Sequence, residues 1–173
     1  MIAGVLFSQA PSPLVREFDY EISEGKADRS RIVHQRQYRL KDVDNRQKVS
    51  GICGILSGLQ GSAIDIDRAS LSTDSLGRVV GIRPEGPHGE SYRIEMGYNS
   101  LNEIVRALVF PAMSVEQAVE YRIEYLYLHS CNYSSQGRGK FITGVLPDGP
   151  WVLRSVKKDG LLVHLTERKI SNK

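Results

Sequence analysis

The dipeptide Asp159-Gly160 constrains the fold of this chain most strongly, because it stands between two runs, residues 151–157 and 161–167, that are typical of β-strands. Asp-Gly between two strands predicts a tight hairpin, since glycine adopts the positive φ that such a turn requires. A third strand-like run, residues 141–146, ends at a turn rich in proline and glycine. The sequence therefore predicts a C-terminal β-meander over residues 139–168.

The N-terminal region predicts another hairpin. Residues 17–22 alternate strictly, with Phe18 and the other apolar side chains on one face and Glu17, Asp19 and Glu21 on the other. This pattern predicts a half-buried strand with an acidic outer face. Residues 31–40 follow a polar link that contains a glycine. We expect them to form the second strand, with basic side chains opposite the acidic ones.

Residues 48–61 carry glycines at regular spacing, at positions 51, 54, 58 and 61. On a helix these glycines share one face. Each glycine inside a helix costs about 1 kcal/mol relative to alanine. A helix here would need close packing to offset that cost, and a strand interrupted by bulges or turns fits the segment equally well. The sequence leaves these two structures open.

The period of the apolar pattern changes near residue 100. Residues 100–103 read Ser-Leu-Asn-Glu and residues 114–117 read Ser-Val-Glu-Gln, and both have the spacing of a helix capping box. We therefore expect one or two short helices around residues 100–128. Residues 119–128 also alternate as a strand rich in tyrosine and β-branched residues, so this part stays ambiguous.

Taken together, these patterns predict an α+β fold with a mostly antiparallel sheet that curls towards a barrel. A chain of 173 residues fits one domain with its own hydrophobic core. We expect a single domain over residues 1–173, with an N-terminal sheet over 1–98, a helical segment over 100–128 and the meander over 139–168.

Several classes of protein are disfavoured. The two cysteines and four histidines are scattered without the spacing of metal ligands, so we expect no metal and no cofactor. No apolar run approaches the ~18 to 20 residues that cross a bilayer, so we expect no membrane partner and a soluble, cytoplasmic protein. The apolar residues 1–7 resemble a first strand rather than a signal peptide.

The segment 134–140, Ser-Ser-Gln-Gly-Arg-Gly-Lys, is similar in composition to a phosphate-binding loop. A P-loop requires a glycine where Ser134 stands and a serine or threonine where Phe141 stands, so nucleotide hydrolysis by that route is excluded. What remains is a glycine-rich loop that carries Arg138 and Lys140, which could contact a nucleic-acid backbone or an acidic partner.

Two basic segments indicate the kind of ligand. Residues 26–48 hold eight basic side chains against three acidic ones, and residues 154–173 hold six against two. The net charge of the chain is only +3, so any electrostatic attraction to nucleic acid must be local. We predict a non-catalytic module that binds RNA or DNA. Its predicted site residues are Arg36, Arg39, Arg138 and Lys140 for phosphates and Tyr38 for stacking.

Two other functions remain open. Tyrosines between residues 121 and 133 suit a protein-protein adaptor or a structural subunit of a larger complex, since tyrosine is enriched at interfaces. A small hydrolase would need a nucleophile, for which Cys53 is one candidate. Another is Ser155, which a two-residue turn at Asp159-Gly160 would place opposite His164.

Overall fold

The structure is a computed structural model, and it describes residues 13–39, 43–61, 63–84, 93–111, 117–128, 133–134, 143–144 and 151–171. Its elements, in chain order, are β1 (Leu14–Ser23), β2 (Lys26–Arg39), α1 (Asn45–Gln60), a 3₁₀ turn η1 (Ile66–Arg68), β3 (Ala69–Thr73), β4 (Val79–Pro84), β5 (Arg93–Tyr98), β6 (Ile104–Phe110), β7 (Val119–Leu128), β8 (Tyr133–Ser134), β9 (Thr143–Gly144), β10 (Trp151–Lys158) and β11 (Leu161–Ser171).

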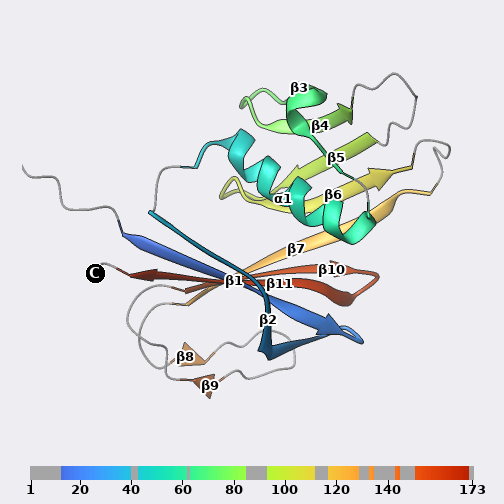
Figure 1. Cartoon of the computed structure of the whole chain (residues 1–173). Helices are drawn as coiled ribbons and strands as arrows, with labels where there is room; N and C mark the ends of the chain where they lie inside the picture. Colours follow the sequence, from blue (N-terminus) through green and yellow to red (C-terminus); the bar gives the residue numbers. More distant parts are fainter. Residues whose placement is uncertain are drawn as a thin grey trace, which may run out of the picture.

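One nine-stranded antiparallel sheet dominates the described structure, in the order β2-β1-β11-β10-β7-β6-β5-β4-β3 (Figure 1). The sheet is open, with β2 and β3 as its edges, so the largely antiparallel architecture is confirmed and no closed barrel is seen. The strands around β1 and β11 cross the view at an angle to those around β5 and β6, as the twist of a large sheet requires (Figure 1).

The two predicted hairpins have different outcomes. β1 pairs with β2, and β10 pairs with β11 through a turn in which Asp159 and Gly160 have φ of 51° and 78°. The three-stranded meander is wrong, because β10 takes β7 as its other neighbour and β9 pairs with β8 in a separate two-stranded sheet. We expected β10 to pair with the strand that lies just before it in the sequence. β7 is further away in the sequence, but it pairs with β10 along a much longer ladder.

Residues 45–60 form a helix, α1, and not an interrupted strand. The Asp44 side chain accepts a hydrogen bond from the Gln47 backbone at 2.8 Å, and the Gln47 side chain accepts one from the Asp44 backbone at 3.0 Å. This capping box satisfies N–H groups that a helix start leaves unpaired. Gly61 ends the helix in the left-handed conformation with φ of 68°.

The helix forms because one of its faces is apolar, and not because its glycines pack closely. A Cβ atom added at Gly51, Gly54 or Gly58 would meet no heavy atom within 4 Å. The opposite face buries four side chains against the sheet: Val49, Ile52, Cys53 and Leu56. Burial of such a face supplies most of the stability of a helix in a folded protein, and here it offsets the cost of the glycines.

Gly54→Ala is expected to raise the free energy of unfolding by about 1 kcal/mol, because Gly54 is exposed, helical and free of neighbours. Urea denaturation of the variant beside the wild type measures the change. Gly61→Ala is the control, and it should be destabilising because φ at this position is 68°. A loss of stability in Gly54→Ala would mean that the glycine face of α1 packs against something.

The expected helices around residues 100–128 are wrong wherever this region is described, because β6 and β7 are strands. The Ser-Leu-Asn-Glu sequence lies in the turn between β5 and β6, where Asn99 Oδ1 accepts hydrogen bonds from the backbones of Leu101 and Glu103, both at 3.0 Å. Asn102 has φ of 58°, which a helix excludes. The second capping box begins in residues 112–116, which lie outside the described residues.

The apolar core lies between α1 and the middle of the sheet. Its buried sheet residues come from β4, β5, β6, β7 and β10: Val79, Ile82, Ile94, Met96, Ile104, Ala107, Val109, Tyr121, Ile123 and Val156. Alternation in β7 puts Tyr121 and Ile123 into this core, and this tertiary contact decides between helix and strand. Within the described residues, no helix is both long and apolar enough to cross a membrane.

Candidate functional site: a basic groove beside the helix

A groove of about 1090 Å³ runs between the first half of α1 and the part of the sheet that the helix leaves uncovered. The strands β1, β2, β7, β10 and β11 form its floor, and Leu101 and Glu103 line it from the turn before β6. The described residues that line it are Glu17, Arg36, Tyr38, Arg39, Val43, Gln47, Lys48, Gly51, Ile52, Leu101, Glu103, Ile104, Tyr125, Tyr127, Val152, Arg154, Thr166 and Arg168.

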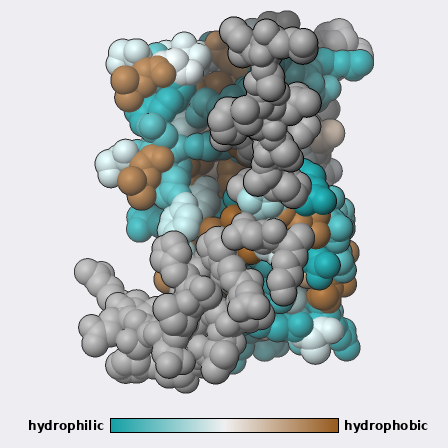
Figure 2. Space-filling view, turned by 90° about the vertical axis from the view of Figure 1, so that its left-hand side faces the viewer, coloured by the Kyte–Doolittle hydropathy of each residue, from teal (hydrophilic) through white to brown (hydrophobic). Residues whose placement is uncertain are grey.

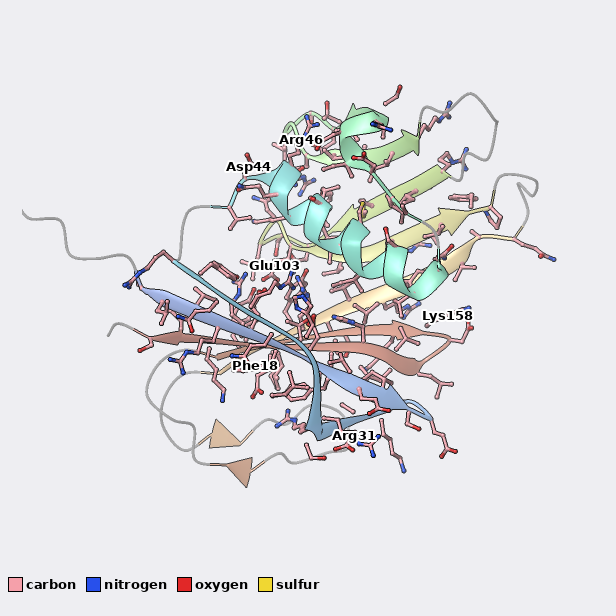
Figure 3. The ribbon with its side chains drawn as sticks, in the orientation of Figure 1. Phe18, Arg31, Asp44, Arg46, Glu103 and Lys158 are labelled. Atoms are coloured by element: carbon pink, nitrogen blue, oxygen red, sulfur yellow. The ribbon has the colours of Figure 1, made fainter. Side chains whose placement is uncertain are left out.

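Figure 3 helps to place the groove, because it labels the lining residue Glu103. Glu103 lies between α1 and the strands below it, whereas Phe18 lies on the side of the sheet away from the helix (Figure 3). Figure 2 shows the side of the molecule at which α1 begins. Hydrophobic residues appear there in several separate groups among hydrophilic ones. This side is therefore mixed in character and has no single continuous apolar patch among the residues that are coloured.

Strand register places the polar side chains of the floor in two adjacent rows. Residues opposite each other in an antiparallel sheet point to the same face, and positions two apart along a strand share that face. The first row, from β2 to β7, is Arg36, Glu17, Arg168, Val152 and Tyr127. The second row is His34, Asp19, Thr166, Arg154 and Tyr125.

The two acidic side chains of the floor are buried and paired. Glu17 is 8% exposed, and its carboxylate lies 3.3 Å from Arg36 Nη2 and 3.2 Å from Arg168 Nε. Asp19 is 9% exposed and accepts a hydrogen bond of 2.8 Å from the Thr166 hydroxyl. The predicted pairing of acidic and basic residues across the first hairpin is confirmed. The acidic face is not an outer face at Glu17 and Asp19, however, because side chains of β2 and β11 cover these two carboxylates.

Four polar or charged side chains surround the carboxylate of Asp19. Its Oδ1 lies 3.3 Å from His164 Nε2, and its Oδ2 lies 3.9 Å from both His34 Nδ1 and Arg36 Nη2. Burial acts to raise the pKa of Asp19. The hydrogen bonds of His164 and Thr166, together with the charges of His164 and Arg36, outweigh burial and lower the pKa below its ordinary value. Asp19 is therefore held ionised next to the groove.

Arg154 differs from Arg36 and Arg168, which both pair with Glu17. Its Nη2 donates to Thr166 Oγ1 at 3.3 Å, and within the described residues its buried Nε has no hydrogen-bond partner. No carboxylate of the described residues forms an ion pair with it. Burial lowers the pKa of this guanidinium.

Aromatic and apolar side chains form the other part of the groove. The rings of Tyr125 and Tyr127 are stacked, with centroids 6.5 Å apart and planes 17° apart. Tyr125 is fixed by a hydrogen bond of 3.0 Å from its hydroxyl to the Ile104 carbonyl, whereas Tyr127 is 49% exposed. Val43 and Leu101 are exposed at the edge of the groove. The groove thus combines cations with ring faces that solvent reaches.

Three of the five predicted site residues, Arg36, Tyr38 and Arg39, lie together in this groove. Arg138 and Lys140 lie outside the described residues. Sequence reasoning missed the basic side chains Lys48, Arg154 and Arg168 and the rings of Tyr125 and Tyr127 as members of the same site. The strand alternation of residues 119–128 was the signal that could have placed the two tyrosines there.

The proposed nucleophiles do not form a catalytic arrangement. His164 lies opposite Val156 and not opposite Ser155, because the register of β10 and β11 shifts between Val156 and Lys157. A shift of one residue turns a side chain to the other face of the sheet. His164 instead faces Thr166, which is 2% exposed and donates its hydroxyl to Asp19. Among the described residues, no cluster of side chains is suited to a metal ion.

Cys53 is expected to be unreactive in the folded protein. It is 1% exposed, and burial raises the pKa of its thiol to about 12, so the nucleophilic thiolate is scarce at neutral pH. In a Cys131→Ser background, a thiol reagent should label Cys53 only after urea is added. Rapid stoichiometric labelling without urea would contradict the buried position and would reopen the hydrolase hypothesis.

In the part of the chain that the structure describes, the fold and the groove define an α+β protein with an open antiparallel sheet, one helix on one face and a basic, tyrosine-lined groove beside that helix. Comparisons of the chain with protein-family models, with curated proteins and with solved structures found no match.

Proposed function

We propose that this protein is a non-catalytic binding module that takes single-stranded nucleic acid into the groove beside α1. The observation that carries the proposal is the composition of the lining. Five cationic side chains (Arg36, Arg39, Lys48, Arg154 and Arg168) line the groove together with three tyrosines (Tyr38, Tyr125 and Tyr127), against the carboxylates of Glu17 and Glu103 in the lining and that of Asp19 in the floor.

Cations and exposed rings in one groove favour a single strand over a duplex. A single strand presents unstacked bases that aromatic side chains can cover, while basic residues follow its phosphates. Each stacked base contributes about 1–3 kcal/mol to binding in proteins of this kind. A duplex hides its bases in the stack, so it would use the arginines but not the rings.

The residues have separate roles in this proposal. Arg36 and Arg39 contact phosphates from β2, and Lys48 does so from the opposite wall on α1. Tyr38 and Tyr127 stack on bases at the two sides of the floor. Arg138 and Lys140 of the glycine-rich segment are proposed as further phosphate contacts.

Fluorescence anisotropy of labelled single-stranded RNA, single-stranded DNA and duplex DNA, at two salt concentrations, tests the proposal. We expect the single strands to bind more tightly than the duplex. Binding should weaken with salt, because neutralised phosphates release counterions. No binding of any strand at low salt would reject the proposal and would favour a protein partner.

A matched pair of lysine variants locates the binding surface. Lys48→Ala is expected to reduce the slope of log affinity against log salt by about 1. Lys158→Ala removes the same charge at the far end of β10, outside the groove, and should change little (Figure 3). Equal effects of the two lysine variants would place binding elsewhere.

Tyr127→Ala should weaken binding about tenfold without changing the salt slope, because it removes a ring and no charge.

A further inference from the structure

Arg154, a partly buried arginine of the groove floor, forms no ion pair with a carboxylate of the described residues, although the charges of Glu17 and Asp19 act on it from a longer distance. Glu17 is shared by Arg36 and Arg168, and Asp19 is engaged by Thr166, His164 and Arg36. Arg154 stands one strand further on, between Thr166 and Tyr125 in the register of the sheet. Its one hydrogen bond within the described residues is the 3.3 Å contact with the Thr166 hydroxyl.

An arginine in this position is unfavourable for the free protein. A buried cation without a carboxylate loses its hydration and gains little in return, and an apolar side chain of similar volume is often neutral or stabilising in such a place. Burial is the main cause that lowers the pKa of Arg154, and it outweighs the charges of Glu17 and Asp19, which act to raise that pKa, while the charge of Arg168 acts to lower it. Unpaired charges in a groove are typical of functional sites, where stability is lost in exchange for binding.

We infer that Arg154 is the anion-binding residue of the groove and that it takes a phosphate group of the bound strand, next to Arg168. This inference rests on the proposed function. Arg154 and Arg168 lie on neighbouring strands and face the same groove, so their guanidinium groups can approach one phosphate from two sides. A phosphate suits this arrangement, because it has several oxygens to accept hydrogen bonds and guanidinium groups bind it in bidentate fashion.

The side chains next to Arg154 leave its positive charge available to a bound anion. The Thr166 hydroxyl gives its proton to Asp19 and presents its oxygen to Arg154, which fixes the guanidinium without neutralising it. The ring of Tyr125 flanks the same position from β7. A phosphate bound here would lie beside the stacked pair Tyr125 and Tyr127, where an attached base finds a ring face.

The test compares Arg154→Met with the wild type in thermal unfolding, using inorganic phosphate and pyrophosphate as probes. Sodium chloride at equal ionic strength is the reference. We expect phosphate to raise the Tm of the wild type above the chloride reference, because a ligand of the folded state stabilises it. Arg154→Met should lose this rise and should be at least as stable as the wild type without phosphate. Arg122→Met, at an exposed arginine of β7, should keep the rise.

Oligonucleotide affinity is measured on the same variants. Arg154→Met is expected to weaken binding of single-stranded RNA or DNA about tenfold or more, as loss of a charged hydrogen bond does. If Arg154→Met fails to fold, Arg154→Lys keeps the charge but not the bidentate geometry. It should then show a reduced phosphate response. An unchanged response in either variant, or a wild type that responds equally to phosphate and chloride, overturns the inference.

The two proposals fail in different ways. A phosphate response that depends on Arg154, without binding of any oligonucleotide, would leave the anion site standing and reject the nucleic-acid function. Oligonucleotide binding that Arg154→Met leaves intact would support the function and reject this anion site.

Discussion

Leu56→Ala is expected to lower the free energy of unfolding by about 3 kcal/mol, since deletion of a fully buried leucine removes apolar burial and leaves a cavity. Leu56 is 0% exposed and is among the largest fully buried side chains of the core between α1 and the sheet. The substitution leaves helix propensity almost unchanged, because alanine and leucine are both good helix formers. Urea denaturation followed by circular dichroism measures the loss.

Leu76→Ala is the matched control for this core variant. Leu76 is 70% exposed in the turn between β3 and β4, so the same change of residue should alter stability by less than about 0.5 kcal/mol. Similar losses in the two variants would mean that α1 does not pack on the sheet as described. The groove would then lose one of its walls.

Asp19→Asn is expected to lower the free energy of unfolding by about 2 kcal/mol at pH 7, because it removes the buried carboxylate that faces Arg36 and that accepts the hydrogen bond of Thr166. The groups that face this carboxylate are His34 and Arg36 on β2 and His164 and Thr166 on β11. Asparagine keeps the shape and part of the hydrogen bonding, so the substitution tests the charge itself.

The pH dependence of Asp19 follows from the direction of its shift. The pKa of Asp19 is lowered in the folded state, so its stabilising contribution is present above the ordinary pKa of 3.8 and is lost as pH falls through the folded-state pKa. The difference between the wild type and Asp19→Asn should therefore be large at pH 7 and should shrink below pH ~4. Asp67→Asn, at an exposed carboxylate, is the control. A difference that stays constant from pH 7 to pH 3 would contradict the ionised carboxylate.

The candidate site was predictable only in part. Arg36 and Tyr38 are two positions apart in β2 and therefore share one face of the sheet. The sequence alone shows that one is charged and the other aromatic. The two basic segments were expected to be able to form one surface, but Arg154 and Arg168 were not singled out as site residues beside Arg36. That assignment needs β11 to lie between β1 and β10, which is a long-range pairing.

The predicted Ser155–His164 pair, which the structure does not form, shows how strongly a site depends on strand register. The turn at Asp159-Gly160 was predicted correctly, and the strands on both sides were predicted correctly. One register shift near Val156 still sends Ser155 to the other face of the sheet from His164. Local sequence signals specify that a hairpin forms, but a bulge depends on how both faces of the sheet pack.

By itself, the sequence determined the elements whose signals are local: the alternation of β1, the Asp159-Gly160 turn and the strand pattern of β10 and β11. The tertiary structure alone decided that the glycine-rich segment is a helix, that residues 104–110 and 119–128 are strands, and that two basic segments meet in one groove. The physical reason is that these segments have ambiguous local preferences. Burial against the rest of the sheet, which depends on residues far away in the chain, outweighs differences of about 1 kcal/mol in local propensity.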